Sequence, residues 1–195
     1  VAEVLAPIAE YPEIQFSLKM RLGWENASEC MVLVELLNAI RLSRIALHAR
    51  TGKQQYKGHP DLEAFQGFYE LCQHPLYYNG GIESLSDIRQ ILIRFPLLKG
   101  VFIGRGLLSS PLLAKEFKGN ETFLPEQRMS IYFAFHEELF SAYSQVLQGE
   151  TQLLVKMKTL WEYFLPETDR KLLKRIKKST RLQQYTESVK AIFTS

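Results

Sequence analysis

The sequence predicts an α/β fold of the (β/α)8 TIM-barrel type, with only about the last four β/α units present, followed by an all-α helical bundle. Four apolar runs, IQFSLK, RIALH, PLYYN and GVFIG, each lead into a loop and then into a stretch with helical periodicity. The residues that end these runs, Lys19, His48, Asn79 and Gly104, are spaced by about one strand–helix unit. Beyond residue 120 only helical periodicity remains.

The apolar runs define the expected strands. Each is short and is bounded by turn-forming residues, and Pro75 suits the first position of the third strand. The carboxyl ends of successive parallel strands are where a barrel of this type holds its active site. Glycine-rich loops after the last two strands suit a phosphate group. The expected strands cover residues 14–19, 44–48, 76–78 and 100–103.

Helices are expected between these strands. Ser28 and Asp61 precede apolar-periodic stretches and are candidate N-cap residues. Ser84 and Asp87 have the spacing of a capping box at the start of the next helix. The expected helices cover residues 28–42, 61–73, 85–95 and 111–117, after the end of a helix at residues 2–10.

The last part of the chain reads as a separate helical domain. Large aromatic residues such as Phe133, Phe140 and Trp161 recur at helical spacing and supply apolar faces. We expect a domain boundary near residue 120, which separates a partial barrel at residues 1–119 from a helical domain at residues 120–195. The expected helices cover residues 126–147, 151–164, 167–178 and 181–193.

The composition is that of a globular protein, with 46% hydrophobic and 23% charged residues among 195. No apolar run reaches the ~18–20 residues that span a bilayer. Two cysteines at unrelated positions indicate neither a disulfide framework nor a metal site, and the His, Cys, Asp and Glu residues show no metal-ligand spacing. We therefore expect a reduced, cytoplasmic protein without a membrane or metal partner.

The net charge of +3 hides an asymmetry between two neighbouring segments. Residues 120–169 carry 3 basic and 8 acidic side chains, a balance of −5, whereas residues 170–195 carry 8 basic and 1 acidic, a balance of +7. Charge runs of this kind are usually solvated helix faces, but they also suit a surface that follows phosphates. The basic residues concerned are Arg170, Lys171, Lys174, Arg175, Lys177, Lys178 and Arg181.

Four parallel strands form half of an eight-stranded barrel. Such a half leaves two open sheet edges and an uncovered inner face. We therefore expect this chain either to be the carboxyl-terminal part of a longer protein or to associate with a second copy.

The motifs carry a family resemblance. The set KMRLGW, HARTGKQQYKG, YYNGGI and GVFIGRGLLSSP, followed by a helical tail, resembles the tRNA-dihydrouridine synthases from the fifth barrel strand onward. The resemblance implies a flavin-bearing (β/α)8 barrel and a helical domain that holds tRNA. It also implies that FMN is reduced by NADPH and passes hydride to C6 of a uracil, which a cysteine then protonates at C5.

The resemblance also implies residue roles. Lys19 would contact the flavin ring or ribityl chain, and His48 would lie near the flavin and its phosphate. Gly104 and Arg105 would hold that phosphate through backbone N–H groups and a guanidinium. The loop over the phosphate arm would be formed by Asn79, Gly80 and Gly81. The residues expected to face the uridine and the tRNA backbone are Arg21, Arg50 and Tyr56, joined on the helical domain by the basic run.

Two departures from the family pattern bear on catalysis. The family's acid is a cysteine in an Asn-x-x-Gly-Cys-Pro loop, and this sequence contains no such motif. Cys30 and Cys72 stand in helical contexts, so no catalytic residue is assigned. The third motif more usually reads Asn-Gly-Asp-Ile, and Gly81 here replaces the acid.

Three functional hypotheses remain open from the sequence. The first is an FMN-dependent tRNA-dihydrouridine synthase, represented here without its cysteine-bearing half. The second is a non-catalytic tRNA- or RNA-binding remnant of that family. The third is a different flavin- or phosphate-binding barrel that acts on a small metabolite.

Overall fold

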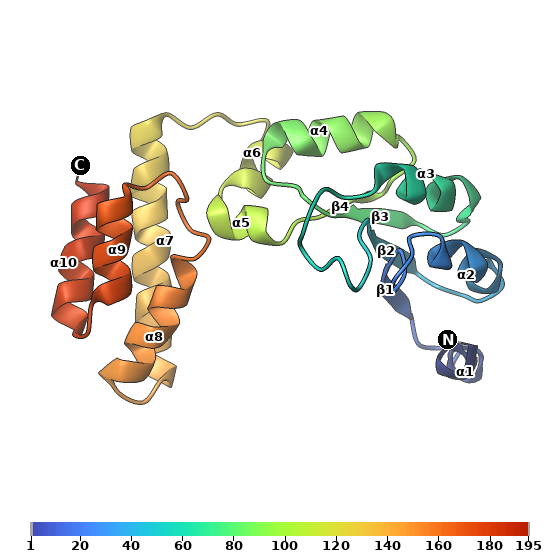
Figure 1. The fold of residues 1–195 in the computed structure, drawn as a ribbon, viewed down its shortest axis with the longest axis horizontal. Helices are drawn as coiled ribbons and strands as arrows, with labels where there is room; N and C mark the ends of the chain where they lie inside the picture. Colours follow the sequence, from blue (N-terminus) through green and yellow to red (C-terminus); the bar gives the residue numbers. More distant parts are fainter. Residues whose placement is uncertain (1, 195) are drawn as a thin grey trace. The chain divides into compact units, whose positions relative to one another are not determined.

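A computed structural model describes residues 2–194, and its contacts divide the chain into two compact units, Val1–Gly104 and Arg105–Ser195. The first unit holds a parallel sheet and its helices, and the second contains only helices among its described residues (Figure 1). The first unit begins with α1 (Ala2–Leu5) and the 3-10 helix η1 (Ala6–Glu10), where the sequence predicts the end of a helix.

The sheet consists of four parallel strands in the order β1-β2-β3-β4. The strands are β1 (Ser17–Arg21), β2 (Arg44–His48), β3 (Leu76–Asn79) and β4 (Gly100–Phe102). All four predicted strands are therefore confirmed, although β1 starts later than expected because the chain turns between Tyr11 and Ile14, where the Ile14 N–H donates to the Tyr11 carbonyl. This βα alternation is consistent with a partial barrel, and barrel closure stays a prediction.

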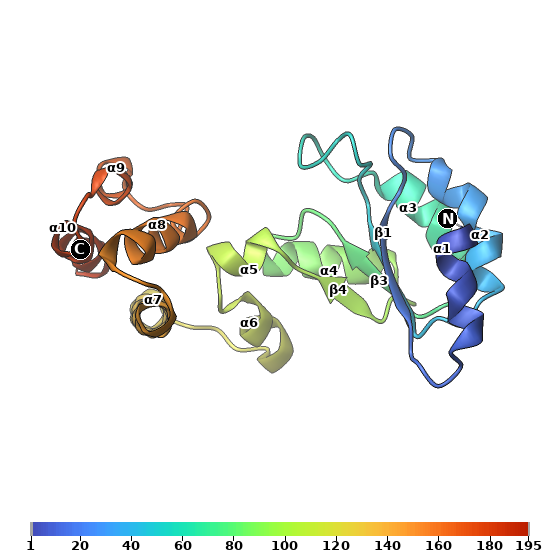
Figure 2. The same cartoon turned by 90° about the horizontal axis from the view of Figure 1, so that it is seen from below.

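Helices α2 (Glu29–Asn38), α3 (Leu62–Leu71) and α4 (Leu85–Arg94) connect the strands and lie on one side of the sheet (Figures 1 and 2). Burial of Phe65 holds this layer together. Its ring meets those of Tyr78 on β3 and Phe95 after α4 at centroid distances of 4.9 and 5.0 Å, both edge-on. All three rings are fully buried, so they form the core between sheet and helices.

The helix starts follow the predicted caps with one exception. The Asp61 side chain accepts a hydrogen bond from the Ala64 N–H, and Ser84 and Asp87 form the capping box of α4. The prediction that Ser28 caps α2 is wrong. Ser28 takes a helical conformation and its side chain bonds Asn26 instead.

The second unit begins earlier than the predicted boundary near residue 120. Helices α5 (Arg105–Ser109) and α6 (Leu113–Gly119) belong to it, and α5 was not predicted. Leu112, between them, is buried in the same cluster as Tyr132. The buried Glu116 carboxylate pairs with Arg128, so both apolar and ionic contacts tie this segment to the helices that follow.

Four longer helices complete this unit: α7 (Pro125–Val146), α8 (Glu150–Leu160), α9 (Arg170–Lys178) and α10 (Leu182–Phe193). All four predicted helices are confirmed. Helix α9 starts at Arg170 rather than near residue 167, because the Asp169 side chain accepts from the Lys171 and Leu172 N–H groups and so caps it. Over residues 2–194, no helix combines the length and apolar character needed to cross a membrane.

Candidate functional site

The register of the sheet brings three predicted site residues into one row. Arg21 on β1 pairs with His48 on β2, and His48 pairs with Asn79 on β3. Side chains in one row of a parallel sheet point to the same face, because strand side chains alternate with period 2. Lys19 stands two residues before Arg21 on the same strand, so it belongs to that face as well.

This face is the side of the sheet away from the helices. Tyr78 and the other residues of the opposite parity are directed into the helix layer, where the Phe65 ring meets Tyr78. On the free face the rings of Tyr77 and Phe102 meet edge-on at 5.5 Å. Lys19 is exposed there, while Arg21 is half-buried. Lys19, predicted to end its strand, instead lies in the middle of β1 (Ser17–Arg21), and it shares this face with the polar row at the carboxyl ends of the strands.

The end of this surface is fixed by backbone contacts. The Asn79 side chain donates from Nδ2 to the Phe102 carbonyl at 2.9 Å, and the Asn79 carbonyl accepts from the Ala49 N–H at 3.0 Å. Asn79 therefore ties the ends of β2, β3 and β4 together. His48 beside it is buried, and its ring lies 6.4 Å from that of Tyr56.

Two arginines organise the loop between β2 and α3. Arg21 donates from Nη1 to the carbonyls of Thr51 (2.6 Å) and Gln55 (3.2 Å), and its guanidinium lies 5.9 Å from the Tyr56 ring centroid. Arg50 is only 5% exposed and donates from Nη2 to the Gly58 carbonyl at 3.0 Å. The structure thus places Arg50 under the loop, whereas Tyr56 stands on its exposed side.

The glycine pair after β3 has a backbone that needs glycine. Gly80 and Gly81 have φ angles of +144° and +58°, in the region that L side chains rarely adopt. A Cβ atom on Gly81 would lie 3.0 Å from Cγ of Pro60, and one on Gly80 would lie 3.4 Å from Cδ2 of His48. At position 81, where the family pattern has an acid, this chain thus has a glycine in a left-handed turn that packs closely against the loop containing Pro60.

Replacing Gly81 by alanine is expected to lower the free energy of unfolding of the sheet unit by about 1–2 kcal/mol, because of the left-handed φ and the contact with Pro60. Urea unfolding would measure this. Gly104→Ala is the matched control, since its φ is ordinary and its Cβ would meet no heavy atom within 4 Å. Equal stability of the two variants would contradict the account.

Gly104 and Arg105 lie at the junction of the two units. Gly104 is exposed and ends the first unit, and Arg105 is the first residue of α5. The phosphate role expected for Gly104 and Arg105 stays a prediction.

The predicted basic run forms one side of α9. Lys171, Lys174, Arg175 and Lys178 recur at the i, i+3, i+4, i+7 spacing of a helix face and line a groove of about 410 Å³ with Gln184, Glu187 and Ser188 of α10. Arg170 and Lys177 flank this stripe, and Arg181 is the N-cap of α10; all three are exposed. The opposite side packs inward through the fully buried Ile176. The structure therefore gathers the cations on one outward surface, the α9 surface.

A family model described as Dihydrouridine synthase (Dus) matches residues 1–194. The chain belongs to the dihydrouridine synthase family. The family predicted from the four motifs is thus confirmed.

Curated relatives agree with the family assignment. The chain is 35% identical over 100 residues to the probable tRNA-dihydrouridine synthase of Rhizobium leguminosarum bv. phaseoli, covering 51% of this chain and 31% of the relative. It is also 35% identical over 105 residues to that of Aquifex aeolicus, covering 54% and 33%. A tRNA-dihydrouridine(16) synthase of Haemophilus ducreyi is 30% identical over 105 residues, covering 53% and 32%. These matches span about a third of the relatives' lengths.

Both cysteines of this family member belong to the helix layer. Cys30 is buried on α2, where desolvation raises the pKa of its thiol to about 11, and its Sγ donates to the Ala27 carbonyl at 3.2 Å. Burial also raises the pKa of Cys72, the C-cap residue of α3. Among the described residues, no group of three His, Cys, Asp or Glu side chains could hold a metal ion.

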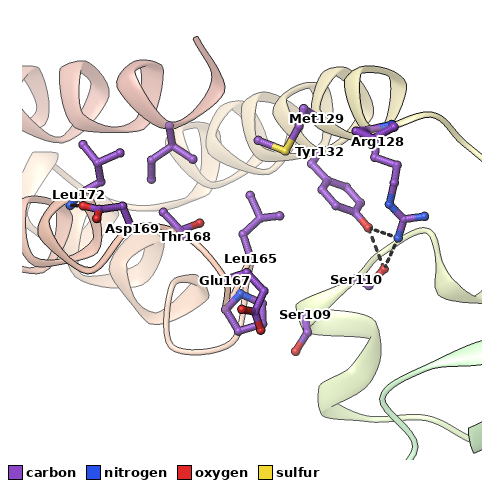
Figure 3. Close-up of a pocket in the computed structure, with 13 residues that line it drawn as sticks. Ser109, Ser110, Arg128, Met129, Tyr132, Leu165, Glu167, Thr168, Asp169 and Leu172 are labelled. Atoms are coloured by element: carbon purple, nitrogen blue, oxygen red, sulfur yellow. Dashed lines mark hydrogen bonds between the residues drawn. The ribbon is translucent and has the colours of Figure 1, made fainter. Parts of the chain in front are cut away.

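The helical unit contains a cavity that sequence analysis missed. It has a volume of about 540 Å³ and lies between α7, the segment after α5 and the loop before α9 (Figure 3). Arg128 and Tyr132 of α7 reach Ser110 on one side, where the Ser110 and Tyr132 hydroxyls are 2.7 Å apart. Asp169 and Leu172 line the other side. Its polar groups come from three segments far apart in sequence, so no local motif indicates it.

A second feature missed by sequence analysis is a buried polar network in the same unit. The Tyr185 hydroxyl accepts from Trp161 Nε1 at 2.9 Å and lies 2.7 Å from His136 Nε2, while His136 Nδ1 lies 3.0 Å from Glu137. Every polar atom is satisfied if Tyr185 donates to Nε2 and the Nδ1–H donates to Glu137. This tautomer requires neutral His136, and burial lowers the pKa of that imidazole accordingly.

Proposed function

We propose that this chain provides the phosphate-side half of the flavin site and the tRNA-contacting helices of a tRNA-dihydrouridine synthase. The enzyme would reduce uridine to 5,6-dihydrouridine in tRNA, with FMN as cofactor and NADPH as reductant. The observation that carries the proposal is the register row of Arg21, His48 and Asn79, with Lys19 on the same open face of the sheet. The family assignment supports it.

The residues of this face fit an FMN molecule. Lys19 offers a cation on an open surface, and the Gly80-Gly81 turn keeps side-chain bulk away from His48 and Pro60. Gly104 leaves open space where a Cβ atom would otherwise project, so a phosphate can approach its backbone. When bound, FMN supplies the hydride-transfer chemistry that no amino-acid side chain can perform.

The side chains of this chain would bind and orient. The Lys19 ammonium would stabilise negative charge on the flavin ring, and Arg105 would pair with the phosphate. Asn79 acts by holding the strand ends, and Arg50 by supporting the loop that carries Tyr56. Arg21 and Tyr56 would face the uridine. The target uridine would have to leave the base stack of the tRNA to reach this surface.

Proton donation to the uracil is not assigned to this chain. The Cys30 and Cys72 thiols are held in helical, desolvated positions, and neither lies on the free face of the sheet. We infer that the proton donor comes from the part of the relatives' length that this chain does not match.

The α9 surface would contact the tRNA backbone. Its cations are exposed and lie on one helix side, which suits successive phosphates, and such contacts position RNA without reading its sequence. This surface also favours the second candidate function, a non-catalytic RNA-binding relative. RNA binding through the α9 surface needs no cysteine and no flavin.

Replacing Arg105 by alanine is expected to weaken FMN binding by about 1–3 kcal/mol, the scale of one charge-assisted phosphate contact. Titration of FMN fluorescence with the purified chain would measure it, with the exposed Arg89→Ala on α4 as the control of equal charge. Unchanged affinity in a folded Arg105→Ala variant would contradict the phosphate role. A chain that binds tRNA but no FMN would favour the second candidate function.

A further inference from the structure

The loop after β1 presents an indole ring to solvent. Trp24 is 65% exposed, whereas the chain's other tryptophan, Trp161, is 2% exposed. Trp24 lies in the KMRLGW motif, and the proposed function assigns it no role. The loop after β2 stands at the same end of the sheet (Figure 2). A large amphipathic ring that is both exposed and held in place is typical of a recognition surface.

The backbone of Trp24 is held on both sides. The Glu29 carboxylate accepts from the N–H groups of Trp24 (2.8 Å), Glu25 (3.0 Å) and Asn26 (2.7 Å). The bond from Trp24 is the main reason that the pKa of Glu29 is lowered. The Trp24 carbonyl accepts from the Lys53 N–H at 2.9 Å. The backbone that carries the ring is therefore held by two loops that are bonded to each other.

The six-membered ring of the indole packs closely against Gly52. A Cβ atom built on Gly52 would lie 2.8 Å from Cζ3 of Trp24 and in closer contact with Cε3, so only glycine leaves room for the ring there. The Gly52 N–H also donates to the Gly23 carbonyl at 2.8 Å. The ring thus packs against the Gly52 backbone and is still 65% exposed.

The surroundings of the ring are basic and aromatic. Residues 19–29 carry two Lys or Arg and two acids, and residues 48–61 carry three and one, a combined balance of five against three, or +2. Tyr56 adds a second exposed ring beside Arg21. Aromatic rings among cations are the usual surface for unpaired nucleotides, because every base has a face that stacks.

We propose that Trp24 is a stacking platform for an unpaired base of the RNA substrate, supported by Gly52. This inference rests on the proposed function for the identity of the partner as RNA. It goes further in assigning a binding role to Trp24 and a positioning role to Gly52. Stacking is indifferent to base identity, so the platform would hold the RNA near the open sheet face without selecting its sequence.

The test measures binding of an unmodified tRNA transcript to this chain over a range of salt concentrations. Trp24→Ala is expected to weaken binding about 5- to 150-fold, the range for loss of one base–aromatic stack, with the salt slope unchanged. Trp24→Phe should retain most of the affinity. Gly52→Ala should weaken binding because it displaces the ring, while Gly67→Ala, whose Cβ would meet only Met31 at an ordinary 3.6 Å, should not.

Tryptophan fluorescence supplies a second readout. Binding of the tRNA should quench the Trp24 emission and protect it from acrylamide, and a blunt RNA duplex without unpaired bases should do neither. If tRNA binds through the α9 surface while Trp24→Ala keeps full affinity and the emission is unchanged, the stacking role is overturned and the proposed function stands. A folded Trp24→Phe variant that binds as weakly as Trp24→Ala would also overturn it. A chain that binds no tRNA at all would overturn both.

Discussion

Replacing Tyr185 by phenylalanine is expected to lower the free energy of unfolding of the helical unit by about 2–4 kcal/mol. The substitution keeps the ring but removes the hydroxyl that serves both Trp161 Nε1 and His136 Nε2. Both partners are buried, and a buried polar group left without a partner costs ~1–3 kcal/mol. Because Trp161 lies inside this unit, its fluorescence during urea unfolding reports the transition directly.

Tyr163→Phe is the matched control, because that tyrosine is 37% exposed and its hydroxyl loss is expected to change stability by less than ~0.5 kcal/mol. Equal effects of the two substitutions would show that the hydroxyl of Tyr185 contributes nothing beyond its ring.

The same network gives the helical unit a defined pH response. Burial lowers the pKa of His136 in the folded state below the ~6.5 of an unfolded histidine, so the unfolded chain binds the proton more readily. The stabilisation is present above pH ~6.5 and is lost as the pH falls below it. His136→Gln, which can still accept from Tyr185, should remove this component, and the difference between the two pH profiles isolates it.

Removing four charges from the α9 surface is expected to weaken tRNA binding about 10²–10³-fold near physiological salt. Lys171, Lys174, Arg175 and Lys178 would each be replaced by glutamine. Each phosphate contact contributes ~0.7–0.9 to the slope of log affinity against log salt, so the slope should become shallower by about 3 to 4. Binding measured at several salt concentrations gives both numbers from one experiment.

The control removes four exposed lysines from elsewhere in the same unit: Lys115, Lys118, Lys156 and Lys190. This control lowers the net charge by the same amount as the α9 variant. It therefore separates an effect of the α9 surface from a general effect of charge. If the two variants lose the same affinity and slope, the α9 surface is not the tRNA contact.

Local sequence was sufficient for most of the fold. Alternating apolar runs and flanking turn residues predict all four strands, and the Ser84–Asp87 spacing predicts a cap that the structure contains. The prediction failed where a local rule met a competing contact. Ser28 does not cap α2, because its hydroxyl donates to the Asn26 side chain, and the Asn26 N–H in turn donates to the Glu29 carboxylate. The boundary near residue 120 is displaced because Leu112 and Glu116 find their partners on α7 and beyond.

The sequence by itself determined the βα order, the family and the cluster of cations, since each depends on short-range pattern and composition. Only the tertiary structure decided which of these residues meet. Strand register, a long-range pairing, placed Arg21, His48 and Asn79 in one row. Packing buried Arg50 beneath a loop and laid Trp24 on Gly52. Tyr185 joins His136 and Trp161 only because α7, α10 and the turn after α8 bury these groups together, where each polar atom must find a partner.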